Sequence, residues 1–81
     1  MTLDKISKIN SEALLADGFE DAIIGMCMQF GQSPVVAYDY GKCLDVLKER
    51  DGMSSEESIE HMEYNVIGAY MGVYSPVFIM K

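Results

Sequence analysis

The sequence lacks tryptophan, contains one histidine, two cysteines and two prolines, and has no apolar run longer than four residues among its 81. A membrane-spanning helix needs roughly 20 predominantly apolar residues in succession. Residues 1–12 carry charges where a secretory signal needs an apolar stretch. We therefore expect a chain that neither enters a membrane nor leaves the cytoplasm.

Basic residues are also scarce. Six lysines and arginines stand against thirteen aspartates and glutamates, which gives a formal net charge of −7. Nucleic-acid backbones are bound mainly through Lys and Arg, so we expect no nucleic-acid partner. Six of the acids lie between Glu49 and Glu63 with a single base among them. They are too sparse to imitate the charge density of a duplex, and a solvated helix face is the simpler interpretation.

The two cysteines, Cys27 and Cys43, lie sixteen positions apart and outside any C-x-x-C motif. A disulfide-stabilised secreted domain of this size would need more of them, so both are expected to be free thiols. Cys43 falls in an apolar helical stripe and is expected to be buried. Cys27 is expected on the second face of a strand, and it is the more reactive thiol if that face is exposed.

The apolar residues of the chain are numerous enough to form one folded core. Apolar residues make up 49% of the chain, which argues against disorder, and a chain of this length accommodates one domain. We divide it into an N-terminal arm, residues 1–17, and a single domain, residues 18–81. The arm is expected to hold one or two helical turns, and its apolar residues include Leu3, Ile6 and Ile9.

Residues 21–30 fit both a strand and an amphipathic helix, because their apolar residues satisfy either period. Gly25 disfavours the helix by about 1 kcal/mol. The turn at 31–34 and the β-branched and aromatic run at 35–38 then favour the strand. Two such runs across a short turn predict a β-hairpin.

The next helix has the clearest local signals. Asp39 is a favourable N-cap residue, and an apolar stripe of helical spacing follows it. That stripe predicts that Leu47 is fully buried. Gly52 follows a basic last turn and predicts a left-handed stop with positive φ.

A second helix should follow directly. Ser54 and Glu57 have the spacing of a capping box, and we expect the helix to run to about Met71. At 100° per residue, its core stripe consists of Ile59, Met62, Val66, Ala69 and Tyr70. A second apolar side consists of Tyr64, Ile67, Gly68 and Met71.

A short strand over residues 77–80 follows Ser75-Pro76. The order of elements is arm–β–β–α–α–β. It predicts an α+β fold with a three-stranded, mostly antiparallel sheet and two helices packed on one face.

Several segments resemble a family of short proteins found in tailed bacteriophages and some bacteria. They are DGFEDAIIG, YDYGKC, RDGMS, an acidic helix that reaches Asn65-Val66, and an exit from Gly72 to Pro76. The resemblance covers about residues 17–78 and implies a bacterial or phage cytoplasmic origin, but no particular activity. Val73 departs from the family pattern, in which an acid follows the glycine, so no charge-based role follows for that loop.

His61 lies one helical turn after Glu57. A metal site needs three or four ligands, and a general base needs a nucleophile and an orienting group. The sequence supplies neither at a recognisable spacing. We therefore expect an exposed, metal-free His61, no cofactor, no catalytic residue and no enzymatic activity.

Asn65 is a polar residue in an otherwise apolar half of the second helix, and Asn is a poor helix former. Two interpretations stay open. Either its side chain bonds a neighbouring backbone group, or it joins Tyr38 and Asp39 in a polar contact with a ligand.

These features predict a non-enzymatic, small protein-binding or self-associating module, because a helix with two apolar sides needs cover on both. The cover for Tyr64, Ile67, Gly68 and Met71 is either the arm or another subunit. We expect a homo-oligomer, most simply a dimer, and consider a host protein as the other partner. The alternative function is binding or sequestering a small signalling or nucleotide-like ligand in a pocket at an oligomer interface.

Overall fold

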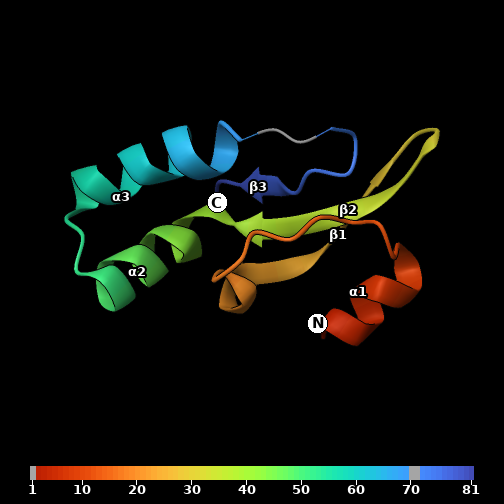
Figure 1. Ribbon diagram of the computed structural model, residues 1–81, viewed down its shortest axis with the longest axis horizontal. Helices are drawn as coiled ribbons and strands as arrows, with labels where there is room; N and C mark the ends of the chain where they lie inside the picture. The colour runs from red at the N-terminus through yellow and green to blue at the C-terminus, as the bar shows by residue number, and fades with distance from the viewer. Residues whose placement is uncertain (1, 70–71) are drawn as a thin grey trace.

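The computed structural model describes residues 2–69 and 72–81, and it confirms the α+β fold (Figure 1). The elements in chain order are α1 (Leu3–Ile9), the 3-10 turn η1 (Glu20–Ala22), β1 (Ile23–Gln29), β2 (Gln32–Asp39), α2 (Tyr40–Asp51), α3 (Ser55–His61), the π-helical segment η2 (Met62–Ile67) and β3 (Val77–Ile79). In Figure 1, α2 and α3 lie at one end of the molecule and α1 lies at the other.

The sheet has the order β1-β2-β3, so β2 is its central strand. The β1–β2 pair is the predicted antiparallel hairpin. The short strand β3 pairs in parallel with β2, and Tyr38 lies opposite Phe78. Their rings stack with centroids 5.4 Å apart. The sheet is therefore mixed, and its longer pair is antiparallel as expected.

The core lies where α2, α3 and the arm meet the sheet. Leu47 is fully buried, as predicted from its stripe, and Cys43 and Met62 are buried with it. Val36 and Tyr38 of β2 belong to the same cluster. The arm contributes Ile6, which is only 3% exposed, so the described part of the arm, residues 2–17, packs as part of the domain.

The arm is held in place by three hydrogen bonds to distant parts of the chain. The side-chain amide of Asn10 donates to the Pro34 carbonyl at 2.8 Å. The Ala16 N–H donates to the Tyr38 hydroxyl at 2.8 Å, and the Leu14 N–H donates to the Tyr74 carbonyl at 3.1 Å. These bonds direct the arm along the sheet rather than over the second helix.

Helix α2 begins and ends at its predicted residues. The Asp39 carboxylate accepts a hydrogen bond from the Lys42 N–H at 3.1 Å, which completes the N-cap. Gly52 stops the helix in the left-handed conformation with φ 67°. Positive φ is readily accessible only to residues without a Cβ, so this glycine is required by the stop.

Helix α3 also begins as predicted. The Ser54 hydroxyl accepts from the Glu57 N–H at 3.1 Å, and the Glu57 carboxylate accepts from the Ser54 N–H at 2.9 Å. These two bonds form the capping box. The helix then changes character, because residues Met62–Ile67 form a π-helical turn.

The second helix ends at Ile67, earlier than the expected Met71, and its core face is rotated by about one residue from the expected stripe. Ser58 is fully buried, and its hydroxyl donates to the Ser55 carbonyl at 2.8 Å. Ile59, expected in the core, is 41% exposed. Met62 is buried as predicted and Val66 is half-buried, but Ala69 is exposed. The remaining expected positions, Tyr70 and Met71, lie outside the described residues.

Candidate functional site

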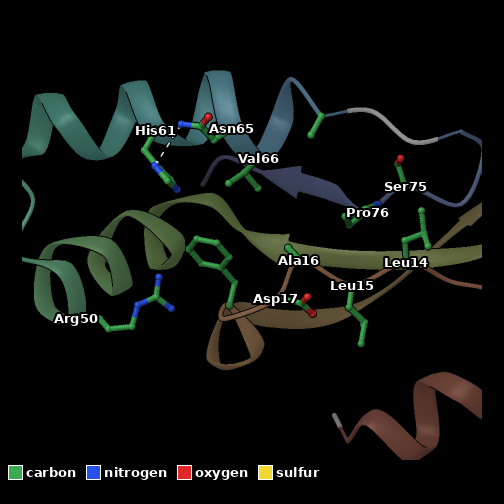
Figure 2. A pocket seen from close by; sticks show the side chains of 12 residues that line it. Leu14, Leu15, Ala16, Asp17, Arg50, His61, Asn65, Val66, Ser75 and Pro76 are labelled. Atoms are coloured by element: carbon green, nitrogen blue, oxygen red, sulfur yellow. Dashed lines mark hydrogen bonds between the residues drawn. The ribbon is translucent and has the colours of Figure 1, made fainter.

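A cavity of about 520 Å³ opens between the arm, the end of α2, the second helix and the segment before β3 (Figure 2). This volume falls within the range of pockets that hold small molecules. Its lining residues are Leu14, Leu15, Ala16, Asp17, Phe19, Arg50, His61, Asn65, Val66, Ala69, Ser75 and Pro76.

The arm forms one apolar wall of the cavity and the second helix forms another. Leu14 is fixed by its backbone bond to Tyr74, and Ala16 is fixed by its bond to the Tyr38 hydroxyl. Val66 and Ala69 face them from the second helix and its C-terminal end. Two hydrogen bonds of the arm thus hold one side of the cavity in place.

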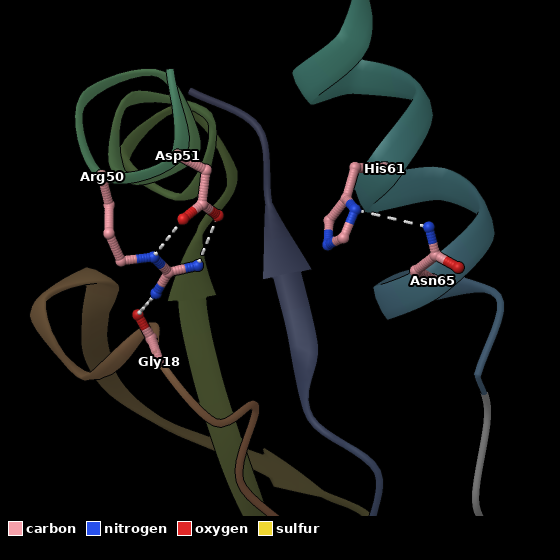
Figure 3. Close-up of polar contacts among 5 residues, drawn as sticks. All are labelled: Gly18, Arg50, Asp51, His61 and Asn65. Carbon is pink, nitrogen blue, oxygen red and sulfur yellow. Dashed lines mark hydrogen bonds and ion pairs between the residues drawn. The ribbon is translucent and has the colours of Figure 1, made fainter. Parts of the chain in front are cut away.

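Arg50 connects the end of α2 to the beginning of the domain (Figure 3). Its Nη1 donates to the Gly18 carbonyl at 2.9 Å, and its Nε and Nη2 donate to the Asp51 carboxylate at 3.1 and 3.0 Å. The guanidinium also lies over the Phe19 ring, 5.6 Å from its centroid. The paired hydrogen bonds raise the pKa of Arg50 and lower the pKa of Asp51. Arg50 therefore acts first as a structural clamp.

His61 and Asn65 form the polar part of the opposite wall (Figure 3). The Asn65 amide nitrogen lies 3.4 Å from His61 Nδ1. An amide nitrogen can only donate, so Nδ1 is the acceptor in this contact. Figure 2 shows the imidazole directed into the cavity. The prediction of an exposed His61 is wrong, since the rotation of α3 leaves it half-buried.

The expected grouping of Asn65 with Tyr38 and Asp39 is not formed. Tyr38 is fully buried, and burial raises the pKa of its phenol. Asp39 caps α2 and pairs with Lys81 at 3.6 Å, and the Lys42 N–H lowers the pKa of its carboxyl. Neither lines the cavity that Asn65 lines. Among the described residues, the Asn65 amide contacts the side chain of His61 rather than a backbone group.

The π-helical turn places Asn65 and Val66 on the cavity. Its wider turn is closed by the Gly68 N–H, which donates to the Glu63 carbonyl at 2.9 Å. π-helical segments are rare and occur frequently at functional sites. A Cβ at Gly68 would lie 2.7 Å from the Glu63 carbonyl oxygen, so this glycine is required by its own helix rather than by an approaching subunit.

The sequence did not identify Arg50, Phe19 or the arm residues as parts of this site. Arg50 and Gly18 are 32 positions apart, and no spacing rule connects them. The available signal was the aromatic Phe19 directly after Asp17-Gly18, because a large apolar residue beside a turn needs a packing partner.

A second surface lies on the outward side of α3 and η2. We call it the outer face. Glu56, Ile59, Glu60, Glu63 and Tyr64 line one groove on it, and we include the exposed Ile67, which also lines a separate hollow with Val73 and Phe78. Tyr64 is 74% exposed and Ile67 is 42% exposed. The arm, which was the intramolecular alternative, leaves these two side chains uncovered. Two of the predicted interface residues are thus accessible, Gly68 is exposed beside them, and Met71 lies outside the described residues.

Shallow grooves flank Tyr64 on both sides. One, of about 460 Å³, is lined by the acidic residues of the outer face together with Ile59. The other, of about 470 Å³, is lined by Met53, Glu57, Glu60, His61, Tyr64 and Asn65. Tyr64 therefore stands between two acidic depressions.

The two thiols differ as their positions predict. Cys43 is fully buried, and burial, with a smaller contribution from Asp39, raises its pKa to about 11. Cys27 is half-buried on β1. Within residues 2–69 and 72–81, no cluster of three or more His, Cys, Asp or Glu side chains is placed to hold a metal ion. No helix in the same ranges is long and apolar enough to cross a membrane.

Comparison of the chain with protein-family models, with curated proteins and with solved structures finds no match.

Proposed function

We propose that this protein is a non-enzymatic protein-binding module and that the outer face of α3 and η2 is its contact surface. One observation carries the proposal: Tyr64 and Ile67 are accessible on a helix whose opposite side, at Ser58 and Met62, is fully buried. Apolar side chains gathered on the surface of a small domain usually mark contacts. Tyrosine is also enriched at protein interfaces.

The intramolecular bonds of the arm support this proposal. Asn10, Leu14 and Ala16 are bonded to residues of β2 and of the segment before β3. To cover Tyr64 the arm would have to break these bonds and remove Ile6 from the core. A partner molecule is therefore the simpler cover.

The proposal is tested by comparing two charge substitutions of similarly exposed isoleucines. Ile67→Glu places a carboxylate on the outer face, and Ile24→Glu places one on β1, where the native side chain is 44% exposed. Immobilised wild-type protein and Ile24→Glu should retain the same protein from a host lysate, and Ile67→Glu should not. Retention that is equal for all three, with circular dichroism showing each to be folded, would remove the outer face as the contact surface.

Self-association is one form of this function, and a dimer stays a prediction. If the outer face binds a second copy, sedimentation at tens of micromolar should give about twice the 9.0 kDa chain mass. Ile67→Glu should return the mass to that of one chain without unfolding it, and Ile24→Glu should leave the dimer intact. A monomeric wild-type protein would leave a different protein as the partner.

The cavity favours a second candidate function, binding of a small molecule. It combines apolar walls at Leu14 and Val66 with the His61–Asn65 pair, which is the composition typical of ligand sites. It is formed within one chain, whereas the sequence-based alternative placed the pocket at an oligomer interface. A ligand from a metabolite panel should raise the melting temperature of the wild-type protein. Val66→Trp, which fills the cavity, should abolish that rise.

The proposed setting is the cytoplasm of a bacterium or of a phage-infected cell. It rests on the resemblance of residues 17–78 to the phage and bacterial family. Expression from the native promoter, with localisation by fractionation, is the test of this setting.

A further inference from the structure

We infer that the partner of the outer face is a basic segment of another protein that carries an apolar anchor. This inference rests on the proposed function and specifies the chemistry of the partner. It is carried by the charges that lie beside Tyr64 and by the two grooves that Tyr64 lines.

The outer face is acidic without compensation. Glu56, Glu60 and Glu63 line the same groove as Ile59 and Tyr64, and residues 51–80 contain no lysine or arginine. Among the described residues, no ion pair or hydrogen bond engages these three carboxylates. They are free to accept charge-assisted hydrogen bonds from lysine or arginine side chains of a partner.

The neighbouring Glu57 has a different role. Its carboxylate is already engaged by the Ser54 N–H in the capping box, which lowers its pKa. It therefore remains ionised beside the second groove while keeping α3 in place. The three unengaged carboxylates and the capping carboxylate together give this end of the molecule its negative potential.

The grooves fit long basic side chains. Each is lined by glutamates and by at least one apolar residue, Ile59 in one and Met53 in the other. Lysine and arginine bury an aliphatic stem while the charged end stays at a polar rim. Tyr64 lines both grooves, and its exposed ring offers a cation–π contact. Ile67, three positions after Tyr64 and 42% exposed, can receive the apolar anchor.

A second copy of the chain fits this surface poorly. A twofold contact brings the same patch together from both subunits, so the glutamates of one copy would face those of the other. Like charges that meet across an interface are strongly unfavourable, and the chain already carries a net charge of −7. Complementarity therefore favours a basic partner of different sequence.

A selection from a random peptide library displayed on filamentous phage tests the inference directly. The selected peptides should share lysine or arginine residues around a large apolar residue. Their affinity, measured by fluorescence anisotropy, should fall as the salt concentration rises, since exposed charge pairs are screened.

Two neutralising variants separate local complementarity from overall charge. Glu60→Gln/Glu63→Gln removes two charges from the outer face. Asp45→Asn/Glu49→Gln removes two from exposed positions of α2 and is the matched control. The outer-face variant should bind the selected peptides about tenfold more weakly, whereas the control should bind them within about twofold of the wild type.

The outcomes distinguish this inference from the proposed function. Neutral or acidic peptides whose binding is lost in Ile67→Glu would overturn the basic partner but keep the outer face as a contact surface. Equal weakening by both neutralising variants would also overturn it, because only net charge would matter. A dimer that Ile67→Glu dissociates would make a second copy the occupant. Peptides that bind Ile67→Glu as well as the wild type, or a selection that yields none, would overturn the inference and the proposed function together.

Discussion

The two helices α2 and α3 begin alike and then diverge. A side-chain oxygen of Asp39 caps the first and one of Ser54 caps the second, each at 3.1 Å from the N–H three residues later. Helix α2 stays regular to its left-handed stop at Gly52. Helix α3 passes into a π-helical turn and presents Tyr64 to solvent.

The two helices therefore differ in role: α2 stabilises the core, whereas the second helix exposes side chains that a partner can contact. The apolar stripe of α2 is directed into the core, and the substitutions most damaging to stability should lie there. The second helix has one buried side, at Ser58 and Met62, and one accessible side. Substitutions on its accessible side should change binding and leave stability largely intact.

The sharpest test of this contrast is truncation of one large apolar side chain in each helix. Leu47→Ala should destabilise the protein by about 2–5 kcal/mol, because it leaves a cavity in a close-packed core. Ile67→Ala should change stability by less than about 0.5 kcal/mol, as expected for a surface position. Urea denaturation monitored by circular dichroism measures both. Equal losses would show that the outer face belongs to the core.

A smaller effect is expected at the stop of α2. Gly52→Ala should destabilise by about 1 kcal/mol, because alanine strains the left-handed backbone that φ 67° requires. Gly41→Ala is the matched control in the same helix: its Cβ would meet only Asp39 Oδ1, at 3.5 Å, and it should stabilise by roughly 0.5–1 kcal/mol. Thermal unfolding compares them. Stabilisation by Gly52→Ala would contradict the assigned stop.

The capping box of α3 should make stability depend on pH. Hydrogen bonds from the Ser54 N–H lower the pKa of Glu57 in the folded protein, so its stabilisation is present above the unfolded pKa of about 4.3. That stabilisation is lost as the pH falls through the lowered folded pKa. Glu57→Gln should therefore destabilise the protein at neutral pH, and the difference from wild type should shrink in acid. A difference that is constant with pH would contradict this.

The reactivity of the two cysteine thiols measures how accessible the core around α2 is to a reagent. Cys43 is fully buried and its pKa is raised to about 11, so near neutral pH it is a protonated and inaccessible thiol. Cys27 should react with Ellman's reagent in the native protein, and Cys43 should react only after denaturation. A Cys27→Ala variant that still reacts rapidly in its native state would show that the core around α2 opens readily.

The parts of the fold that could be predicted are those fixed by neighbouring residues. Asp39, Gly52 and the Ser54–Glu57 pair each act within a few positions, and the structure places all of them as expected. The β1–β2 hairpin follows from a turn between two strand-forming runs. Local signals of this kind agree with one another in natural sequences.

The phase of the second helix could not be predicted by hydrophobicity. Ser58 is buried in place of the more apolar Ile59 because its hydroxyl bonds the Ser55 carbonyl within the same turn and needs no water. Beyond His61, the periodicity of 100° per residue no longer applies, since the π-helical turn is wider. The cavity could not be predicted from the sequence either. It depends on contacts between distant segments, such as the hydrogen bond from Arg50 to the Gly18 carbonyl.

The parallel pairing of β3 has a consequence for the order in which the molecule assembles. Strands β1 and β2 meet across a two-residue turn, whereas β3 reaches β2 only after residues 40–76. Closing the longer loop costs more chain entropy, and pairing of distant segments is slow. We expect the hairpin and α2 to form first and β3 to dock last. Ser75 and Pro76, which precede β3, line the cavity, so we expect the cavity to be completed only when β3 docks.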